Sequence, residues 1–428
     1  MGCSKAATAS IPMHGCDVDS LVPKIIGNIE NPIVMDYITN VEYDDNDYTY
    51  TKVLEYCSIP TDWDKTHPSP INVTIDESVV QKLNNDEIDS LIIYVYDDDC
   101  QLVRRDVYEL GYEVPIYNLI PDQEYYYTVS YNGVDGYNYF IDDGYLEVEG
   151  RFRAIRVEGM HNFRDIGGYK TIYGKRIKYD KLFRSAELLR KANLSQGNIT
   201  KKGVDEIVNN LKIDIELDFG DENTESPLQG IIEFINDRDY KITSYDIALD
   251  TESLGFTGDH IKNCFELLLE KLKQDKKVLF HCNAGADRTG TLAFILEALL
   301  GVSESDLAKD YEITSFFQGH TRRRDMDSKP DRGSGYPAMI SYIKTHFEGN
   351  NINEKVEKMM LSFSITQDQI KEFRQIMLEE YNGAPSKIDI HNDKSIMPAS
   401  MYNMQGLRLL QQQNRGMIYY NGRKLYFH

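Results

Sequence analysis

The sequence predicts a multidomain protein, with an all-β sandwich in its N-terminal part and an α/β domain after it. The chain has 428 residues, which is more than one ordinary domain core accommodates. Residues 36–154 contain aromatic and β-branched runs that end at Asp, Asn and Gly turns, with no helical period between them. From residue 155 onward, apolar residues at helical spacing alternate with short strand-like runs, which is typical of an α/β domain.

Charge and cysteine content exclude several classes of protein. With 69 Asp and Glu residues against 47 Lys and Arg residues, the formal net charge is −22, which argues against nucleic acid as a partner. The sequence has no apolar run of about 18 residues, so no membrane-spanning helix is predicted. The six cysteines lack zinc-site spacing, and we expect neither a metal nor another cofactor.

The N-terminal β region resembles a known module at one place. The stretch "NLIPDQEYYYTV", which starts at Asn118, is similar to fibronectin type III modules, where a leucine-proline turn precedes an alternating tyrosine strand. We therefore expect a fibronectin type III-like β-sandwich at residues 36–154, with an unrelated β-sandwich as the alternative. Residues 1–35 are polar and mixed, and they are expected to form a tether.

In the α/β part, the order of elements places one loop after a strand. Apolar spacing predicts helices at 204–211 and 261–272, a strand at 213–217 and a short buried strand from Val278. The run "RTGTLAFILEALLG" is expected to be a helix that ends at Gly301. The loop "HCNAGAD" therefore lies between the C-terminal end of a strand and the N-terminus of a helix, where α/β folds bind ligands.

This loop carries the groups that phosphoryl transfer through a cysteine requires. A helix N-terminus offers unpaired N–H groups and a partial positive charge, which favour a bound anion and a thiolate, so Cys282 is the candidate nucleophile. Arg288 can bind two phosphate oxygens with its planar fork. Gly285 lets the backbone amides turn inward, and the Thr289 hydroxyl can hydrogen-bond the thiolate. Together these groups predict a cysteinyl-phosphate intermediate that needs no metal.

The specificity of this pattern comes from the combination of residues. The predicted phosphate-binding residues are Asn283, Ala284, Gly285, Ala286, Asp287 and Arg288. His281, Cys282, Gly285, Arg288 and Thr289 are expected together by chance in roughly one of several thousand chains. A nucleotide-binding P-loop is excluded because Gly-Lys-Ser/Thr is absent. The alternative is a buried, inert cysteine at a strand end.

The residues from His281 to Thr289 match the signature of cysteine-dependent protein-tyrosine and dual-specificity phosphatases. The stretches "NFRDIGGY" at residues 162–169 and "LFRS" at 182–185 resemble the atypical bacterial tyrosine-phosphatase subfamily. The likeness covers residues 155–385. It implies a tyrosine-phosphatase fold, with a parallel-rich central sheet flanked by helices.

The resemblance also assigns roles, and the sequence departs from the subfamily at two places. Cys282 corresponds to the nucleophile and Arg288 to the phosphate clamp. Ala286 stands where many relatives have a lysine, which lowers the expectation of phosphoinositides or other multiply phosphorylated substrates. Asp218-Phe219-Gly220 stands where the subfamily has Asp-Leu-Arg, so an arginine contact common to relatives is missing.

The leaving oxygen needs a proton, so a general acid is expected within hydrogen-bond reach. Asp250 is preferred because it precedes Cys282 by 32 residues, a separation similar to that of the general-acid loop in dual-specificity phosphatases. Asp287, inside the loop, and Asp218, at a strand end, are the alternatives. The ordinary role of an aspartate is that of a solvated or capping carboxylate.

Several other residues are assigned supporting or surface roles. His281 and Thr289 are expected to support the loop. Asn162, Arg164 and Asp165 are expected to brace the floor of the active site through hydrogen bonds. The basic run of Arg322, Arg323 and Arg324 is expected to be solvated, with attraction of acidic peptide flanks as the alternative. Residues 386–428 predict a β-like C-terminal tail.

The N-terminus and two cysteines bear on location. Met1-Gly2-Cys3 is either the clipped remnant of a bacterial lipoprotein or an ordinary polar terminus. Cys57 and Cys100 lie in the same region and could pair in an oxidising compartment. We expect an exported protein of the bacterial cell envelope, or a secreted one, with Cys3 as its only membrane tether. A cytoplasmic protein is the alternative.

These expectations define a protein-tyrosine phosphatase, with dual specificity as an extension, whose partner is a phosphotyrosine-containing protein or peptide. The first alternative is a phosphatase for phosphoinositides or small phosphate esters. The second is a surface binding protein in which the phosphatase fold is a non-catalytic ligand module.

Overall fold

The computed structural model covers the whole chain and describes residues 24–43, 52–56, 67–189, 198–220, 225–242, 257–317, 322–325 and 335–381, with four short strands beyond residue 400. The chain divides into two compact units, Met1–Glu380 and Tyr381–His428. Within the described part, no helix is both long and apolar enough to cross a membrane.

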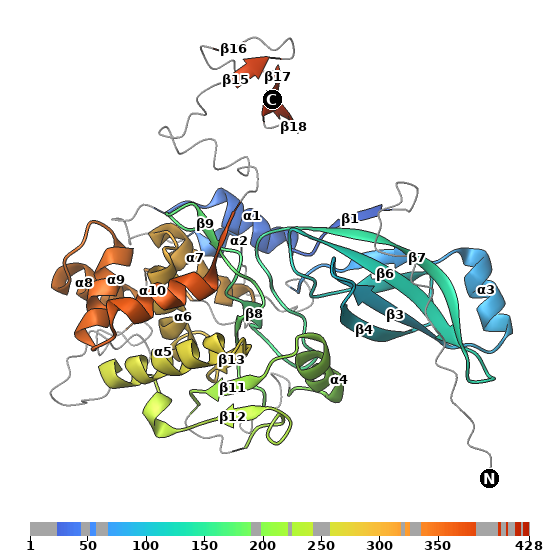
Figure 1. Cartoon of the computed structure of the whole chain (residues 1–428), viewed down its shortest axis with the longest axis horizontal. Helices are drawn as coiled ribbons and strands as arrows, with labels where there is room; N and C mark the ends of the chain where they lie inside the picture. Colours follow the sequence, from blue (N-terminus) through green and yellow to red (C-terminus); the bar gives the residue numbers. More distant parts are fainter. Residues whose placement is uncertain are drawn as a thin grey trace. The chain divides into compact units, whose positions relative to one another are not determined.

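Two sheets form the N-terminal β part, and the strands of the larger one are labelled in Figure 1. The larger sheet has the order β1-β7-β6-β3-β4, in which β1 joins β7 in parallel and the other neighbours are antiparallel. Its strands are β1 (Lys24–Asn28), β3 (Ser90–Tyr96), β4 (Leu102–Glu109), β6 (Gln123–Asn132) and β7 (Asn138–Glu149). The smaller sheet pairs β2 (Ile71–Thr74) with β5 (Glu113–Ile116), and helix α3 (Glu77–Asn85) follows β2.

The core of the β part lies between these two sheets. Val73 of β2, Val114 of β5 and Ile93 of β3 are fully buried in one apolar cluster. In β2 the burial alternates along the strand, as expected when one face of a sheet is covered and the other is exposed. The five-stranded and the two-stranded sheet therefore share one apolar core.

The predicted tether at residues 1–35 and the predicted start of the β part at residue 36 are both wrong for the described residues. Strand β1 begins at Lys24, and α1 (Pro32–Asn40) follows it directly. The Asn31 side chain accepts from the N–H groups of Ile33 and Val34, which caps the helix. The misassigned stretch is only moderately apolar, and its burial depends on long-range contacts that local composition does not reveal.

Helix α1 packs into the α/β core. Its buried residues Val34, Tyr37 and Ile38 have helical spacing and belong to the large apolar cluster that also contains Phe280 of the α/β sheet. The Tyr37 ring packs against Phe316 at a centroid distance of 5.4 Å. Helix α2 (Val53–Tyr56) adds Val53 to the same cluster. The α/β core is therefore completed by two helices that lie between β1 and β2 of the β part in sequence.

The central sheet of the α/β part has the order β12-β11-β13-β10-β8. Its strands are β8 (Arg164–Asp165), β10 (Leu182–Ser185), β11 (Ile215–Asp218), β12 (Glu233–Ile235) and β13 (Val278–His281). All neighbours are parallel except β8, which is antiparallel to β10. Strands β10, β11 and β13 are buried along their whole length, as is typical of parallel strands covered on both faces.

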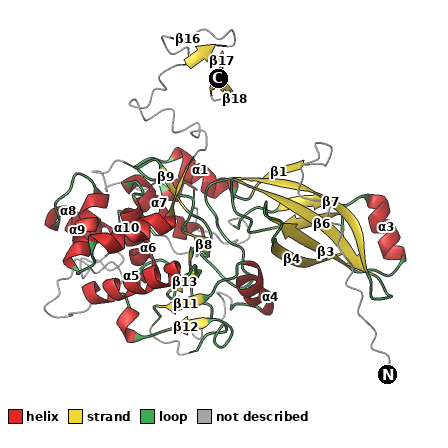
Figure 2. Cartoon of the chain, viewed as in Figure 1, coloured by secondary structure: helices red, strands yellow, loops and turns green. Residues whose placement is uncertain are grey.

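Helices cover both faces of this sheet (Figure 2). They are α4 (Lys201–Asp205), α5 (Thr257–Lys273), α6 (Arg288–Leu300), α7 (Glu304–Ile313), α8 (Tyr336–His346), α9 (Ile352–Ser362) and α10 (Gln367–Met377). The predicted helix at 204–211 overlaps the end of α4 and the π-helix η3 (Glu206–Asn210) that continues it, so its start and its type differ from the prediction. The predicted helix at 261–272 lies within α5, and α6 ends at Gly301 with a φ of 95°.

Alternation along the strands assigns each side chain to one face. In β13, Val278 and Phe280 belong to the cluster beneath α5 and α6, whereas Leu279 belongs to the cluster beneath α4 and η3. His281 must therefore point to the same face as Leu279. In β10, Phe183 lies on the α4 face, so Arg184 points to the α6 face.

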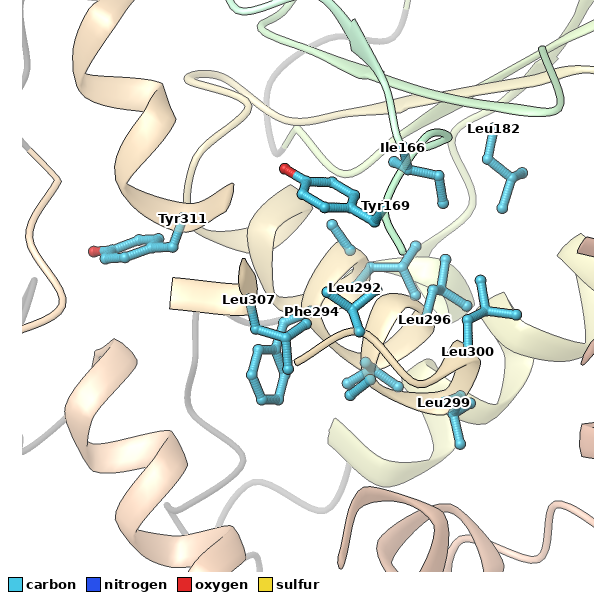
Figure 3. Packing of buried hydrophobic residues seen from close by; sticks show 14 of the residues in the cluster. Ile166, Tyr169, Leu182, Leu292, Phe294, Leu296, Leu299, Leu300, Leu307 and Tyr311 are labelled. Atoms are coloured by element: carbon cyan, nitrogen blue, oxygen red, sulfur yellow. The ribbon is translucent and has the colours of Figure 1, made fainter. Parts of the chain in front are cut away.

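Helix α6 is buried on all sides. It contacts β10, β13, α7, α9 and α10. Figure 3 shows Leu292, Leu296 and Leu300 of α6 packed with Ile166 and Leu182. A helix that is apolar all round is expected in the centre of a domain.

Two small sheets complete the described structure. Strand β9 (Lys175–Ile177) pairs with β14 (Leu378–Glu380), which follows α10. In the C-terminal unit, four strands form an antiparallel sheet in the order β16-β15-β17-β18, and they lie in the region where a β-like tail was predicted. They are β15 (Met401–Asn403), β16 (Arg408–Leu409), β17 (Gly416–Tyr420) and β18 (Arg423–Phe427).

A buried ion pair joins the β part to the α/β part. The Arg104 guanidinium of β4 donates to both carboxylate oxygens of Glu206, at 2.8 and 2.9 Å. Asn118 also donates to Glu206, and its backbone carbonyl accepts from Arg153 at 2.8 Å. The Glu30 carboxylate accepts from the backbone N–H of Phe152 at 2.6 Å. These contacts fix the β part against the α/β core.

The burial of α1 in the α/β core predicts a large effect of truncating Tyr37. Tyr37→Ala removes a fully buried aromatic side chain, so we expect the free energy of unfolding to fall by about 3–5 kcal/mol. Ile33→Ala on the same helix is the control, because Ile33 is 43% exposed and its loss should change little. Urea unfolding of both variants measures the difference. Equal stabilities would show that α1 is dispensable to the core.

Candidate active site

The predicted catalytic loop lies at the carboxyl edge of the central sheet. It runs from Cys282 to Asp287, between β13 and α6. In the sheet register, His281 pairs with Ser185 of β10 on one side and with Asp218 of β11 on the other. The ends of three parallel strands therefore meet at the loop, and Cys282 lies there almost completely buried.

Gly285 allows the loop to approach strand β10 closely. Its φ is +64°, and a Cβ atom at this position would lie 2.2 Å from the carbonyl oxygen of Ser185. No side chain fits in that space, so the sequence requires glycine here for both conformation and clearance. The Gly285 carbonyl accepts a hydrogen bond of 2.9 Å from the buried guanidinium of Arg184. Gly285 is therefore held by its close packing against Ser185 and by the hydrogen bond from Arg184.

Arg288 begins α6 and is oriented by backbone and loop. Its Nη1 donates to the carbonyl oxygen of Phe219 at 2.6 Å, and its Nη2 donates to Oδ1 of Asn283 at 3.1 Å. Phe219 directly follows β11, and its N–H donates to the His281 carbonyl at 2.8 Å. Cys282, Asn283 and Arg288 are thus brought together in one short loop and the turn beside it.

Asn162 and Arg164 support the loop from beneath. The Asn162 amide donates to the carbonyl oxygen of Ala284 at 3.1 Å. Arg164 donates to Oδ1 of Asn162 and, at 3.2 Å, to Oδ1 of Asp310 on α7. Asn162 adopts a φ of 53°, a left-handed conformation that Asn tolerates better than most residues. The predicted floor contacts of Asn162 and Arg164 are present in this arrangement.

Asp165 does not join this floor, contrary to the expectation. One of its carboxylate oxygens pairs with Arg153 at 2.9 Å and accepts from the Asp180 N–H at 2.7 Å. The other accepts from the Gly167 N–H at 2.8 Å. Neighbouring residues of a strand point to opposite faces, so Asp165 cannot follow Arg164 toward the loop. It stabilises the turns that precede β10 instead.

A second charged cluster was not predicted and lies on the α6 face of the sheet. Arg184 donates to Gly285 and also to Oδ2 of Asp310, so Asp310 is shared by two buried arginines. Burial alone would raise the pKa of Asp310, but Arg164 and Arg184 hold it below its ordinary value. Burial, with the charge of Asp310, raises the pKa of the nearby Glu297 far above its ordinary range. At neutral pH, Asp310 is therefore the ionised carboxylate of this cluster.

His281 lies on the opposite face with two acidic partners. Its Nε2 lies 2.9 Å from Oε1 of Glu216, and its Nδ1 lies 3.6 Å from Oδ1 of Asp218. Burial by itself would lower the pKa of His281, but the hydrogen bond to Glu216 and the nearby carboxylate charges raise it to about 9. A positively charged imidazolium therefore precedes Cys282 in the chain at neutral pH. Thr289 is fully buried at the start of α6.

Two of the three candidate general acids, Asp287 and Asp218, lie within the described residues. Asp250 lies outside the described residues. Both oxygens of Asp287 accept from Arg322, at 3.0 and 2.9 Å. Asp218 is buried, and its Oδ1 accepts from the Gly220 N–H at 2.6 Å. Asp287 is thus paired with an arginine, and Asp218 accepts a backbone hydrogen bond.

The basic run at residues 322–324 is not a solvated surface, which corrects the expectation. Arg322 forms the bidentate pair with Asp287, and Arg323 forms one with Asp325 at 2.9 and 2.6 Å. Arg324 is only 3% exposed, and its guanidinium lies 3.6 Å from the centre of the Tyr43 ring. Arginine is well suited to such sites because it stacks on rings and pairs bidentately with carboxylates.

Sequence reasoning missed the contacts of Arg184, Glu216 and Asp310. Two of these had a local signal, because "LFRS" and "IELD" place charged residues inside strands that are otherwise apolar. Asp310 had none, since its partners Arg164 and Arg184 are distant in sequence. In the described part of the chain, no three His, Cys, Asp or Glu side chains are grouped so that they could hold a metal ion.

Comparisons with known proteins agree on one family. A model of the tyrosine phosphatase family matches residues 155–385. A tyrosine-protein phosphatase of Nostoc commune is 29% identical over 177 residues, in an alignment that covers 37% of this chain and 56% of that protein. A protein of Cupriavidus necator that carries a tyrosine-protein phosphatase name is 27% identical over 187 residues, with coverages of 37% and 64%. The alignment thus spans less than two thirds of either relative.

The raised pKa of His281 predicts a pH-dependent stability. Because the folded pKa of about 9 exceeds the ordinary value of 6.5, the stabilisation is complete below about pH 6.5 and is lost as the pH rises through 9. Its full size is roughly 3 kcal/mol. Urea unfolding from about pH 6 to about pH 10 measures this loss.

Glu216→Gln provides the comparison, since it removes the hydrogen-bonded charge that raises the His281 pKa. The stability difference between wild type and this variant should shrink as the pH rises. His346→Gln, on the exposed side of α8, should leave the pH profile of stability unchanged. Parallel profiles for wild type and Glu216→Gln would contradict the assignment.

Proposed function

The chain belongs to the tyrosine phosphatase family, and on that premise we propose that it is a cysteine-dependent protein-tyrosine phosphatase. Its substrates are phosphotyrosine residues of proteins or peptides. The observation that carries the proposal is the loop between β13 and α6, where Arg288 is oriented beside a buried Cys282 that follows a charged His281. The names of both relatives support the same activity.

The proposed reaction has two steps. In the first, the Cys282 thiolate attacks phosphorus, an S–P bond forms and the ester P–O bond breaks, while the general acid gives a proton to the leaving oxygen. In the second, water attacks phosphorus and gives a proton to the carboxylate form of the general acid, the S–P bond breaks, and inorganic phosphate and the thiolate are released. Arg288 and the backbone N–H groups of residues 283–288 bind the phosphate oxygens in both steps.

The same geometry suggests which aspartate supplies the proton. Asp287 is engaged by Arg322 through both of its oxygens, which suits an anchor for the loop. Asp218 faces His281 and the Gly220 amide on the α4 face. We therefore assign the general acid to Asp250, for which the support is its position in the sequence.

Substrate preference follows from the charge of the loop. Ala286 adds no positive charge, so a single phosphate monoester is favoured over multiply phosphorylated inositol rings. Dual specificity toward phosphoserine and phosphothreonine is part of the proposal, because the motif is shared by both phosphatase classes. The non-catalytic alternative is weakened by the joint presence of Cys282 and Arg288 in one built loop.

The proposal extends to the N-terminal part and to location. A fibronectin type III-like identity of the β part is supported by its two facing sheets, although its range begins at Lys24 rather than at residue 36. Cys100 is disulfide-bonded, which supports an oxidising, extracytoplasmic location. Its predicted partner Cys57, and Cys3 as a lipid-bearing residue, lie outside the described residues.

The first experiment tests the activity and the nucleophile together. Hydrolysis of a phosphotyrosine peptide and of a phosphoinositide is measured in chelator and reductant. We expect peptide turnover by the wild type and a loss of roughly 1000-fold or more in Cys282→Ser, because the covalent route is removed. His346→Gln is the control, since the exposed His346 side chain contacts only Thr345 and Tyr342 of its own helix in the hydrogen bonds it makes. Hydrolysis of the lipid alone would favour the phosphoinositide alternative, and no hydrolysis would favour the binding protein.

The assignment of the general acid predicts different pH profiles for two variants. Asp250→Asn should lower kcat by about 10²–10⁴-fold and remove the basic limb of the profile, because that limb reports deprotonation of the acid. Asp287→Asn should retain the basic limb, since its partner Arg322 still binds one carbonyl oxygen. A lost basic limb in Asp287→Asn alone would transfer the role to Asp287.

A further inference from the structure

Lys241 holds a turn beside the phosphate-binding arginine. It follows the short 3-10 helix η4 (Arg238–Tyr240). Its ammonium donates to the carbonyl oxygen of Asp218 at 2.8 Å, and also to the carbonyl oxygen of Gly220 and to Oδ1 of Asn236. Three acceptors match the three N–H bonds of an ammonium group, so the Lys241 side chain has a single well-defined position.

The two backbone acceptors lie on either side of Phe219. The Phe219 carbonyl is the group that accepts the 2.6 Å hydrogen bond from Arg288. On its other side, the Phe219 N–H donates to the His281 carbonyl, and the fully buried ring packs 6.4 Å from the ring of Phe280. The turn from Asp218 to Gly220 thus connects Lys241 to the guanidinium of Arg288.

The backbone of Lys241 is itself held in place. The Lys241 carbonyl lies 2.6 Å from Nδ1 of His260 on α5. On the same helix, Cys264 donates to the Tyr240 carbonyl at 3.3 Å, and Asn263 donates to the Asp239 carbonyl at 3.0 Å. Lys241 therefore projects from a segment anchored on α5, and it can restrain the turn.

We propose that Lys241 is a positioning residue for Arg288: it fixes the Asp218–Gly220 turn so that the Phe219 carbonyl orients the guanidinium toward the phosphate. This inference rests on the proposed function, in which Arg288 binds the phosphoryl group. Charged hydrogen bonds to carbonyl oxygens are among the stronger interactions that can hold a turn. A misplacement of about 1 Å in such a group can reduce the rate by about 100-fold.

The test compares Lys241→Met with a matched lysine variant in the full chain. Lys271→Met is the control, because Lys271 lies on α5 and pairs with Glu233 at 2.9 Å instead of contacting the turn. For Lys241→Met we expect kcat/KM on a phosphotyrosine peptide to fall by roughly 10–100-fold. The inhibition constant for inorganic phosphate should rise by about tenfold, while Lys271→Met matches the wild type. Lys241→Arg should recover much of the loss, since it retains the charge and several donors.

A double-mutant cycle separates positioning from a direct effect of charge. In an Arg288→Ala background, Lys241→Met should no longer weaken the binding of inorganic phosphate, because its effect passes through the missing guanidinium. An equal weakening in both backgrounds would overturn the proposal. So would a folded Lys241→Met variant whose kcat/KM and phosphate inhibition match those of Lys271→Met.

An unfolded Lys241→Met variant and an inactive wild type have different consequences for the proposal. If Lys241→Met does not unfold cooperatively, Lys241→Gln replaces it: its amide has two donors for the three acceptors and no charge, so we expect smaller changes of the same sign in the same readouts. If the wild type neither hydrolyses the peptide nor binds inorganic phosphate, the proposed function fails, and the inference about Lys241 fails with its premise.

Discussion

The structure of the loop between β13 and α6 depends on the buried guanidinium of Arg184. This side chain is completely inaccessible, and it links the Gly285 carbonyl to the Asp310 carboxylate of α7. A buried charge is costly unless it is paired and hydrogen-bonded, and Asp310 provides that pairing for both Arg184 and Arg164. Because Arg164 in turn binds Asn162, which binds the Ala284 carbonyl, two consecutive loop carbonyls are anchored to one carboxylate.

The alternation of side chains along the strands places positive charge on both faces of the sheet beneath the loop. Arg184 approaches the loop from the α6 face, and the imidazolium of His281 lies on the α4 face beside Glu216. The chain as a whole carries a net charge of −22, so the environment of an anion here is set locally and not by overall composition. The N-terminus of α6 contributes its partial positive charge to the same place.

Sequence patterns predicted those parts of the site whose residues are close together in the chain. They did not predict contacts between residues that are distant in the chain. The order of strand, loop and helix around Cys282 follows from local periodicity and from Gly301, and the structure has this order. The contact of Arg184 with Asp310 spans 126 positions, so local patterns could not show it. The same limit explains the error at residues 24–35. The apolar spacing in residues 32–40 indicates a helix but not its packing partner. Helix α1 is buried against α7, which lies far along the chain.

Helix α7 explains why the chain is not cleanly divided at residue 155. Besides Asp310, it contributes Glu312, which accepts from the hydroxyl of Tyr37 at 2.6 Å and from the backbone N–H of Arg324 at 2.8 Å. Two residues before Arg324, Arg322 binds Asp287 in the loop between β13 and α6. Tyr37 of α1 and the segment from Arg322 to Arg324 therefore share the buried carboxylate of Glu312. Since a buried carboxylate retains its position only while its donors remain, the packing of α1 and the geometry of the loop are parts of one cooperative core.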